Sequence, residues 1–295
     1  MSPSFKSVAL IGKYKSPQIA EPLLKLAGFL EARGVEVMID RLTAGNIRDC
    51  RYPAAALEEL GDKADLAIVL GGDGTMLNIA RTLAPFDVAL VGVNQGRLGF
   101  LTDISVDTMF ETIGAILEGE YVTEDRMLLE SDVFCGGEAV FNVLAFNDVV
   151  IAKGVRGGMV EFEVHIDGEA IYTQRSDGLI VATPTGSTAY ALSAGGPIVH
   201  PALRVMSLVP VCPHTLSNRP IVISSDSVVE IVVHGADDPR VHFDSHSHCE
   251  LMPGDLIRIK RYARPVRLLH PLGHDYYHML REKLHWSESP VTRQK

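Results

Sequence analysis

The stretch Leu66-Ala67-Ile68-Val69-Leu70-Gly71-Gly72-Asp73-Gly74-Thr75 decides the fold of this chain. An apolar run that ends at a glycine-rich segment is typical of a buried strand that stops at a tight turn. Glycine lacks a Cβ, so the backbone here can take positive φ and let a bulky charged ligand come close. Residues 76–83 have helical spacing, and the N–H groups that begin such a helix suit a phosphate. A bare carboxylate repels phosphate, so we expect Asp73 to hold a metal ion or to accept a hydroxyl proton.

Strands and helices alternate on both sides of this stretch. Apolar runs predict strands at residues 8–11, 35–39 and 88–93. Helical spacing predicts helices that begin near residue 16 or 21, over 54–60 and over about 106–117. Such alternation implies parallel pairing. The ligand crevice of a parallel sheet lies at the carboxyl ends of its strands, where we expect residues 71–75 to lie.

The pattern changes near residue 122. Residues 160–166 alternate between apolar and polar, and Asp167-Gly168 is a hairpin signal that leads into a partner strand. Further alternating runs lie at 227–233, 256–260 and 266–270. We therefore predict an α/β domain with a parallel sheet over 1–122 and an all-β, antiparallel, sandwich-like domain over 123–272. Residues 273–295 are expected to include a helix and to pack back on the N-terminal domain.

The composition narrows the classes of protein that fit. A chain of 295 residues, 46% hydrophobic and 22% charged, is typical of a two-domain globular protein. A net charge of −10 without basic runs argues against binding to nucleic acid. No apolar run approaches the roughly 20 residues that span a bilayer, and we expect no membrane partner. The N-terminus lacks a signal-peptide core, and the four cysteines are scattered, so we expect reduced thiols in a cytoplasmic protein.

Two polar segments beyond the glycine turn are candidate binding elements. The block Thr183-Pro184-Thr185-Gly186-Ser187-Thr188-Ala189-Tyr190 follows an apolar strand and is dense in donors for phosphate or ribose oxygens. Asn147-Asp148 precedes the apolar run 149–151, where an amide and a carboxylate can clamp a diol. Each segment alone also fits an ordinary capped turn.

Other site types match less well. No lysine follows the glycine turn as in a Walker loop, and residues 92–99 lack the spacing of a Rossmann fingerprint. Histidines gather at 242–248 and 270–278 without zinc spacing. We therefore expect hydrogen-bonded or solvated imidazoles and no dedicated protein metal site.

Together, these blocks resemble the NAD kinase family, most closely its proteobacterial type. The resemblance covers nearly the whole chain and rests on residues 71–75, 92–101, 147–148, 175–178, 183–190 and 193–197. The block from 183 to 197 is the most specific, because other kinases with the glycine–aspartate turn lack it. The resemblance implies NAD bound between the two domains, ATP as phosphate donor with Mg²⁺ or another divalent cation carried by the nucleotide, and a homodimer or homotetramer.

The resemblance also implies roles for individual residues. Asp73 would lie beside the 2′-hydroxyl of the adenosine ribose and accept its proton. Gly74 would approach the NAD backbone, and Asn147 and Asp148 would bind ribose and adenine groups. The remaining implied NAD contacts are Arg175, Asp177, Thr188, Ala189, Tyr190 and Ser193, with Asn94, Phe100 and His246 as further candidates.

The chain departs from the family pattern in three places. Asp148 stands where the family usually has glutamate, and Asp244-Ser245-His246 replaces an element that usually ends in glutamine. Gly157-Gly158 replaces a bulkier segment, so no side-chain contact is carried over there. Two other functions stay open from the sequence: a lipid- or sugar-phosphate-directed kinase of the same glycine–aspartate group, and a non-catalytic dinucleotide sensor. Arg175 favours oxidised NAD over NADH by the same resemblance.

Overall fold

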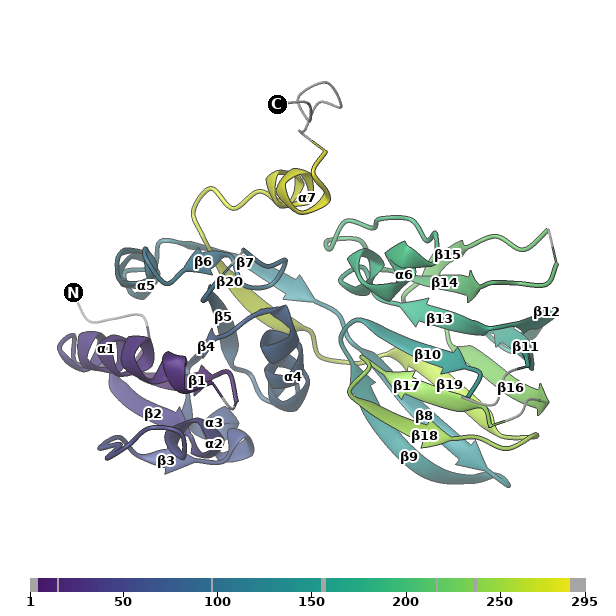
Figure 1. Cartoon of the computed structure of the whole chain (residues 1–295), viewed down its shortest axis with the longest axis horizontal. Helices are drawn as coiled ribbons and strands as arrows, with labels where there is room; N and C mark the ends of the chain where they lie inside the picture. Colours follow the sequence, from purple (N-terminus) through teal and green to yellow (C-terminus); the bar gives the residue numbers. More distant parts are fainter. Residues whose placement is uncertain are drawn as a thin grey trace. The chain divides into compact units, whose positions relative to one another are not determined.

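The computed structural model of the protein describes residues 5–14, 16–96, 98–154, 158–215, 217–235 and 238–286. The chain forms two compact units (Figure 1). Unit 1 comprises Met1–Glu124 and Arg267–Lys295, and unit 2 comprises Asp125–Val266. The chain therefore leaves unit 1 once and returns to it with its C-terminal residues. Gly157, one of the two glycines at which no side-chain contact with a ligand is expected, lies outside the described residues.

Unit 1 is built on an eight-stranded sheet in the order β3-β2-β1-β4-β5-β20-β7, with β6 beside β5. Its strands are β1 (Ser7–Gly12), β2 (Glu36–Asp40), β3 (Ala54–Ala55), β4 (Leu66–Leu70), β5 (Ala89–Asn94), β6 (Ile104–Ser105), β7 (Tyr121–Arg126) and β20 (Val266–Pro271). Pairing is parallel from β3 through β20. The carboxyl ends of β4 and β5 therefore meet at one edge of the sheet.

Unit 1 also contains helices. They are α1 (Ala20–Glu31), α2 (Arg41–Ala44), α3 (Leu57–Lys63), α4 (Asp73–Leu83), α5 (Met109–Leu117) and α7 (Tyr276–Leu284), with a 3₁₀ turn at Pro17–Ile19. The apolar faces of α1 and α5 join one cluster with alternate residues of the strands, among them Leu10 and Ile68. The intervening residues of β4 are also fully buried, and α4 packs against β4 without joining that cluster. Burial on both faces explains why the strands have continuous apolar runs.

Two predicted elements differ from the structure. The helix expected over 54–60 begins only at Leu57, because Ala54–Ala55 pairs with the exposed edge of β2 and satisfies its backbone groups. The run 266–270, expected among the strands of the β domain, instead forms β20 and pairs with β5. Leu268 and Leu269 point to opposite faces and are both buried, which suits an inner strand of a covered sheet.

Unit 2 consists of two six-stranded antiparallel sheets. One has the order β15-β14-β13-β10-β17-β18 and the other β12-β11-β16-β19-β8-β9. The strands of the first sheet are β10 (Asp148–Ala152), β13 (Gly178–Ala182), β14 (Val205–Val211), β15 (Ile221–Ser224), β17 (Arg240–Phe243) and β18 (Ser247–Glu250). Those of the second are β8 (Leu129–Cys135), β9 (Glu138–Ala145), β11 (Val160–Ile166), β12 (Glu169–Ser176), β16 (Val229–Gly235) and β19 (Leu256–Arg261).

The two sheets of unit 2 enclose one apolar core. Alternate residues of both sheets join a single buried cluster, with Val149 and Val181 from one sheet and Phe162 and Ile231 from the other. The short segments Gly186–Thr188 (3₁₀) and Tyr190–Ser193 (α6) follow β13. The predicted fold class, a parallel α/β domain followed by an antiparallel, sandwich-like β domain, is confirmed. The hairpin predicted at Asp167-Gly168 is confirmed as well, with φ of 55° and 84° at these residues.

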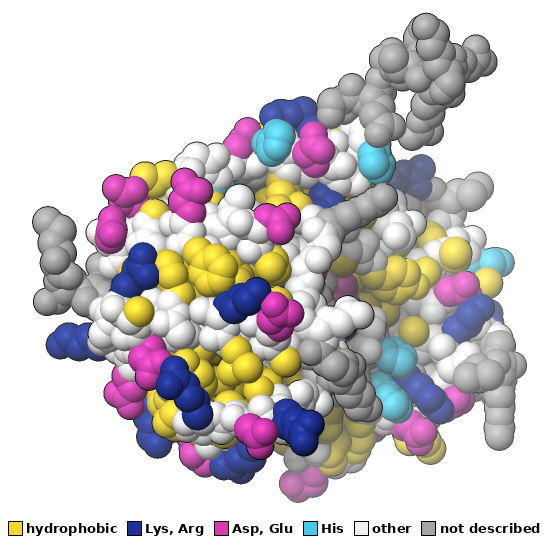
Figure 2. All heavy atoms as spheres, turned by 60° about the vertical axis from the view of Figure 1, so that its left-hand side comes forward, with side chains coloured by type: hydrophobic (Ala, Val, Ile, Leu, Met, Phe, Trp, Pro, Cys, Tyr) yellow, Lys and Arg dark blue, Asp and Glu magenta, His cyan; other side chains and the backbone are white. Residues whose placement is uncertain are grey.

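The surface carries charges of both signs. Figure 2 shows Lys and Arg side chains lying next to Asp and Glu side chains on the face turned toward the viewer. Within the described ranges, no helix is long and apolar enough to cross a membrane. All four cysteines are free thiols.

Candidate active site

Asp73 is the first residue of α4, directly beyond β4. Gly72 is the N-cap residue, with φ −105° and ψ −178°, so the chain passes from strand to helix through an extended residue. None of Gly71, Gly72 and Gly74 has a positive φ. The positive φ that glycine permits is therefore not used at this turn, because the chain needs no reversal there.

The glycines of this segment leave space. A Cβ on Gly71 would lie 2.7 Å from Oγ1 of Thr75, whereas a Cβ on Gly72 or Gly74 would meet nothing within 4 Å. Gly74 is exposed. The N–H groups of Asp73 and Gly74 lie in the first helical turn and have no acceptor within the described part of the chain. Open space beside free N–H groups at a helix N-terminus favours an anionic group.

The carboxylate of Asp73 is held by the loop that follows β5. The backbone N–H of Phe100 donates to Oδ2 at 2.9 Å, and the N–H of Leu101 donates to Oδ1 at 3.0 Å. The hydroxyl of Thr102 lies 3.2 Å from Oδ1 and donates to it. Three donors therefore fix the orientation of the carboxylate.

Gly99 allows this loop to come so close. A Cβ at residue 99 would lie 2.0 Å from Oδ1 of Asp73 and 2.4 Å from Oγ1 of Thr102. Gly92 has the same role one step back, since its Cβ would lie 2.4 Å from the carbonyl oxygen of Leu101. Gly92 and Gly99, which fit no nucleotide-binding fingerprint, are thus explained by the close approach of the loop.

Asn94 stabilises the loop through two hydrogen bonds of its side chain. Its Nδ2 donates to Oγ1 of Thr102 at 2.9 Å, and its Oδ1 accepts from the N–H of Gly96 at 2.7 Å. Asn94 is only 8% exposed and Thr102 is fully buried. Thr102 was not among the residues predicted from the sequence; the available signal was its position directly after the segment 92–101.

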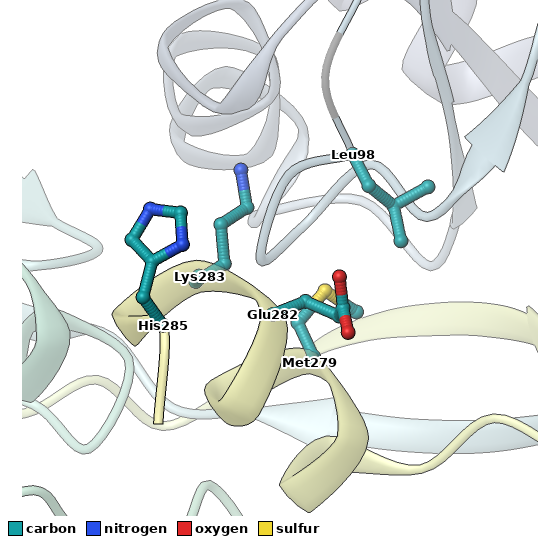
Figure 3. Close-up of a pocket in the computed structure, with 5 residues that line it drawn as sticks. All are labelled: Leu98, Met279, Glu282, Lys283 and His285. Atoms are coloured by element: carbon teal, nitrogen blue, oxygen red, sulfur yellow. The ribbon is translucent and has the colours of Figure 1, made fainter. Parts of the chain in front are cut away.

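Helix α7 lies beside the same loop. A cavity of about 400 Å³ is lined by Leu98 and by Met279, Glu282, Lys283 and His285 (Figure 3). Nζ of Lys283 lies 6.0 Å from the centroid of the Phe100 ring. The C-terminal helix therefore contacts the segment that binds Asp73.

In unit 2, Asp244 holds the segment that contains Asn147 and Asp148. Oδ2 of Asp244 accepts from the N–H of Phe146 at 2.8 Å, and its Oδ1 accepts from the N–H groups of Asn147 and Asp148 at 2.7 and 3.0 Å. Asp244 and Ser245 have positive φ in the hairpin turn between β17 and β18. The Asp244-Ser245-His246 element is thus a turn that aims its aspartate at the candidate site, while His246 is exposed on the same turn.

The Thr183–Tyr190 block packs directly on this segment. The N–H of Thr183 donates to the carbonyl oxygen of Asn147 at 2.9 Å, and its hydroxyl donates to that of Phe146 at 2.7 Å. A Cβ at Gly186 would lie 2.1 Å from the carbonyl oxygen of Asn147. Buried Arg126 donates to the hydroxyl of Thr185 at 3.1 Å. The block is a built part of the unit rather than a loose surface turn.

Asp148 is only 3% exposed. The pKa of Asp148 is raised to about 7, mainly by burial and secondly by the negative charge of Asp244. Its carboxyl accepts no hydrogen bond from the residues that the structure describes. Asp148 can therefore carry a proton near neutral pH and donate a hydrogen bond to a ligand.

The remaining candidates of unit 2 fall into two groups. Thr188, Ala189, Tyr190 and Ser193 follow the block, and Tyr190 and Ser193 are exposed. Arg175 and Asp177 lie at the opposite end of β13, where Gly178 pairs with Ala152 while Ala182 pairs with Asp148. The four residue steps from Gly178 to Ala182 span about 13 Å along the strand. Arg175 pairs with Glu161 at 3.7 Å, and Asp177 pairs with Lys153 at 2.8 Å.

The sequence of the chain matches one family over most of its length. Residues 8–121 match the ATP-NAD kinase N-terminal domain, and residues 146–270 match the ATP-NAD kinase C-terminal domain. The chain is 60% identical over 283 residues to the NAD kinase of Nitrosomonas eutropha, covering 96% of both chains. It is also 60% identical over 290 residues to the NAD kinase of Nitrosospira multiformis, covering 98% of this chain and 99% of that one.

Two solved structures share the fold. Yeast NADH kinase complexed with NADH has a TM-score of 0.89 at 23% identity, covering 97% of this chain and 89% of that chain. An NAD kinase from Archaeoglobus fulgidus in complex with ATP has a TM-score of 0.73 at 26% identity, covering 95% of this chain and 98% of that chain. This chain belongs to the ATP-NAD kinase family.

Proposed function

We propose that the protein transfers the γ-phosphoryl group of ATP to the 2′-hydroxyl of the adenosine ribose of NAD, forming NADP and ADP. One observation carries the proposal: the Asp73 carboxylate, fixed by three donors, lies next to free N–H groups at the start of α4. The relatives named NAD kinase and the related structure in complex with ATP support the choice of substrates.

In this proposal Asp73 accepts the proton of the ribose hydroxyl. That hydroxyl is far too weak an acid to ionise first, so its O–H bond breaks late, as the oxygen bonds to the γ-phosphorus and the bond to ADP breaks. Oδ1 of Asp73 already accepts two hydrogen bonds and Oδ2 accepts one. Each carboxylate oxygen has two lone pairs, so Oδ2 keeps one position for the incoming proton, which then passes to solvent.

Charge neutralisation is the second requirement of the reaction. Phosphoryl transfer depends on positioning and on neutralising charge more than on covalent catalysis. Mg²⁺ or another divalent cation carried by ATP would supply positive charge when bound. The N–H groups of Asp73 and Gly74 add donors for a phosphate oxygen.

The NAD contacts proposed for unit 2 centre on Asn147 and Asp148, with the ribose and adenine as their ligands. Gly74 is proposed to approach the NAD backbone, since a Cβ there meets open space. The other proposed contacts are Arg175, Asp177, Thr188, Ala189, Tyr190 and Ser193, with Phe100 and His246 as further candidates. The hydrogen bonds of Asn94 to Thr102 and Gly96 favour a supporting role for this amide over direct contact with NAD. A homodimer or homotetramer stays part of the proposal.

The substitution Asp73→Asn tests the proposal. It keeps the size and most of the hydrogen bonds of the side chain and removes the proton acceptor. We expect a fall in kcat of at least about 1,000-fold in a coupled assay for NADP, with the dissociation constant for NAD changed less than about threefold. The control is Asp107→Asn, at an exposed aspartate a few residues beyond the same loop. Substantial activity in Asp73→Asn would remove Asp73 from the role of proton acceptor, and absence of NADP formation by the unsubstituted chain would refute the function itself.

A further inference from the structure

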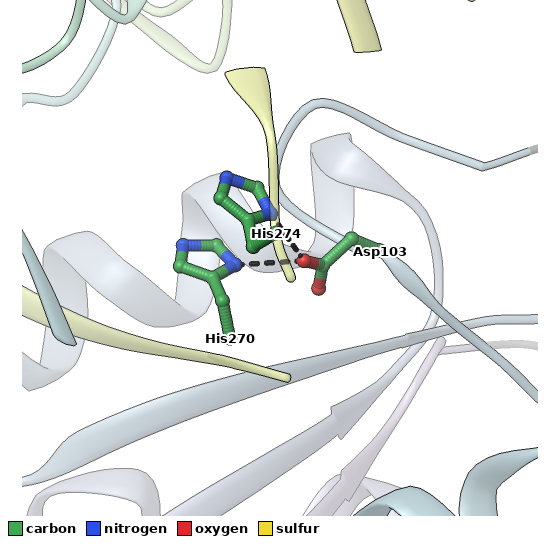
Figure 4. Close-up of side chains that lie close together, drawn as sticks. All are labelled: Asp103, His270 and His274. Atoms are coloured by element: carbon green, nitrogen blue, oxygen red, sulfur yellow. Dashed lines mark hydrogen bonds and ion pairs between the residues drawn. The ribbon is translucent and has the colours of Figure 1, made fainter. Parts of the chain in front are cut away.

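Two histidines and two carboxylates form a buried cluster in unit 1. Nδ1 of His270 and Nδ1 of His274 each lie 2.8 Å from Oδ2 of Asp103 (Figure 4). Nε2 of His270 lies 3.2 Å from Oε2 of Glu124. The side chain of His270 is 2% exposed and that of Asp103 is 6% exposed. The cluster joins the loop after β5 to β20, which carries His270, and to the segment between β20 and α7, which carries His274.

The geometry fixes the protonation of His270. Both of its ring nitrogens face carboxylate oxygens, which accept hydrogen bonds and donate none. Both nitrogens must therefore donate, and the ring is an imidazolium. Burial opposes that charge, but the hydrogen bonds to Asp103 and Glu124 outweigh it and raise the pKa of His270. Burial also opposes the charge on Asp103, yet the hydrogen bonds from His270 and His274 lower its pKa to about 2.

His274 has the opposite character. Its Nδ1 donates to Asp103, while its Nε2 is buried without a partner in the described residues. A proton on Nε2 would be a buried, unsatisfied donor, so the ring is neutral with its proton on Nδ1. The rings of His274 and His270 stack with centroids 3.9 Å apart and an interplanar angle of 19°. A neutral ring over an imidazolium is attractive, whereas two cations at that distance would repel.

The distances favour hydrogen bonds over a bound metal ion. Ligands at about 2.1 Å around a tetrahedral ion would lie about 3.4 Å apart. The two nitrogen–oxygen pairs at Asp103 lie at 2.8 Å, the length of a charge-assisted hydrogen bond. Hydrogen bonds from the two histidines, and not a metal ion, therefore hold Asp103 in place.

The cluster lies next to the loop that binds the proposed proton acceptor. Asp103 directly follows Thr102, whose hydroxyl donates to Asp73, and the loop donates two further hydrogen bonds from Phe100 and Leu101. We infer that His270 and His274 are positioning residues for phosphoryl transfer: by binding Asp103 they hold the end of the loop in the conformation that orients the Asp73 carboxylate. This inference rests on the proposed function.

Two variants of the full chain test the inference. His270→Gln removes the positive charge and the second donor, and His274→Phe keeps a ring for stacking but removes the donor to Asp103. We expect kcat to fall about 10- to 100-fold in His270→Gln and about 3- to 10-fold in His274→Phe, with KM for NAD changed less than about threefold, because a misplacement near 1 Å costs up to about 100-fold. The control is His278→Gln, at an exposed histidine of α7 that stands outside the cluster.

A second measurement separates this inference from the proposed function. The backbone amide resonances of Phe100 and Leu101 report the hydrogen bonds to Asp73 whether or not the chain phosphorylates NAD. We expect both to shift in His270→Gln and His274→Phe and to stay in place in His278→Gln. Side-chain nitrogen resonances should show His270 doubly protonated and His274 protonated on Nδ1 alone. Unchanged kcat in His274→Phe, or unmoved Phe100 and Leu101 amides in either variant, overturns the inference; if His270→Gln does not fold, His274→Phe and the side-chain resonances decide.

Discussion

Substitution of Gly99 by alanine should disable Asp73 while leaving the Asp73 residue itself unsubstituted. The new Cβ would lie 2.0 Å from Oδ1 of Asp73 and 2.4 Å from Oγ1 of Thr102. Ordinary non-bonded contacts lie at about 3.5–4.0 Å, so the carboxylate or the loop must move by roughly 1–2 Å. Such a movement breaks or lengthens the hydrogen bonds to the carboxylate, which are worth about 1.5–3 kcal/mol each. A misplacement of this size at a reacting group costs about 100-fold in rate.

The assay is steady-state NADP formation with thermal unfolding beside it. We expect kcat of Gly99→Ala to fall at least about 100-fold, with stability reduced by about 1–3 kcal/mol as for other overpacked sites. Gly96→Ala is the matched control on the same loop, because its Cβ would meet only Oδ1 of Asn94, at 3.9 Å. If Gly99→Ala kept more than about half of the kcat of the unsubstituted chain, the loop would not orient Asp73 and the reasoning would be refuted.

Two further predictions concern unit 2. The pKa of Asp148, raised from its usual 3.8 to about 7, makes the folded state prefer the protonated form, so this group lowers the free energy of unfolding as pH rises from about 4 to 7. Asp148→Asn should remove that decline and stabilise the chain at pH 8 by up to roughly 3–4 kcal/mol, whereas urea unfolding that shows equal or lower stability at pH 8 would contradict the assignment. Gly186→Ala should weaken NAD binding at least about tenfold by calorimetry, because its Cβ would lie 2.1 Å from the carbonyl oxygen of Asn147; unchanged affinity would place the dinucleotide away from Asn147.

The order of strands and helices could be predicted from local sequence patterns. The unit to which each strand belongs could be predicted only in part. Continuous apolar runs such as 66–70 marked covered strands, and the alternation at 160–166 marked a strand of the β sandwich. Strand β20 was assigned to the wrong sheet, because the sequence of a six-residue strand does not identify the strand with which it pairs. Its place beside β5 follows from burial on both faces, which depends on helices and strands far away in the sequence.

Candidate site residues could be selected from the sequence by residue type, whereas the contacts between them could not be predicted. Asp73 and the Thr183–Tyr190 block could be selected from the sequence because their segments are rich in glycine and hydroxyl residues. The three donors on Asp73 include two backbone N–H groups, which any residue could supply. The link between Asp103 and His270 joins residues 167 positions apart, so no local spacing could reveal it.

The glycines of both candidate segments act by the same physical means. Gly99 lets a loop reach the Asp73 carboxylate, and Gly186 lets the Thr183–Tyr190 block reach the backbone of Asn147; neither has a positive φ. In both places the missing Cβ is replaced by an atom of a proposed site residue. A glycine that serves backbone direction tolerates asparagine or aspartate, which visit left-handed conformations. A glycine that serves close approach leaves no room for a side chain, so the two candidate segments should reject even alanine. The hairpin glycine of Asp167-Gly168 has open space around its Cβ position and positive φ, so asparagine there should cost only backbone strain.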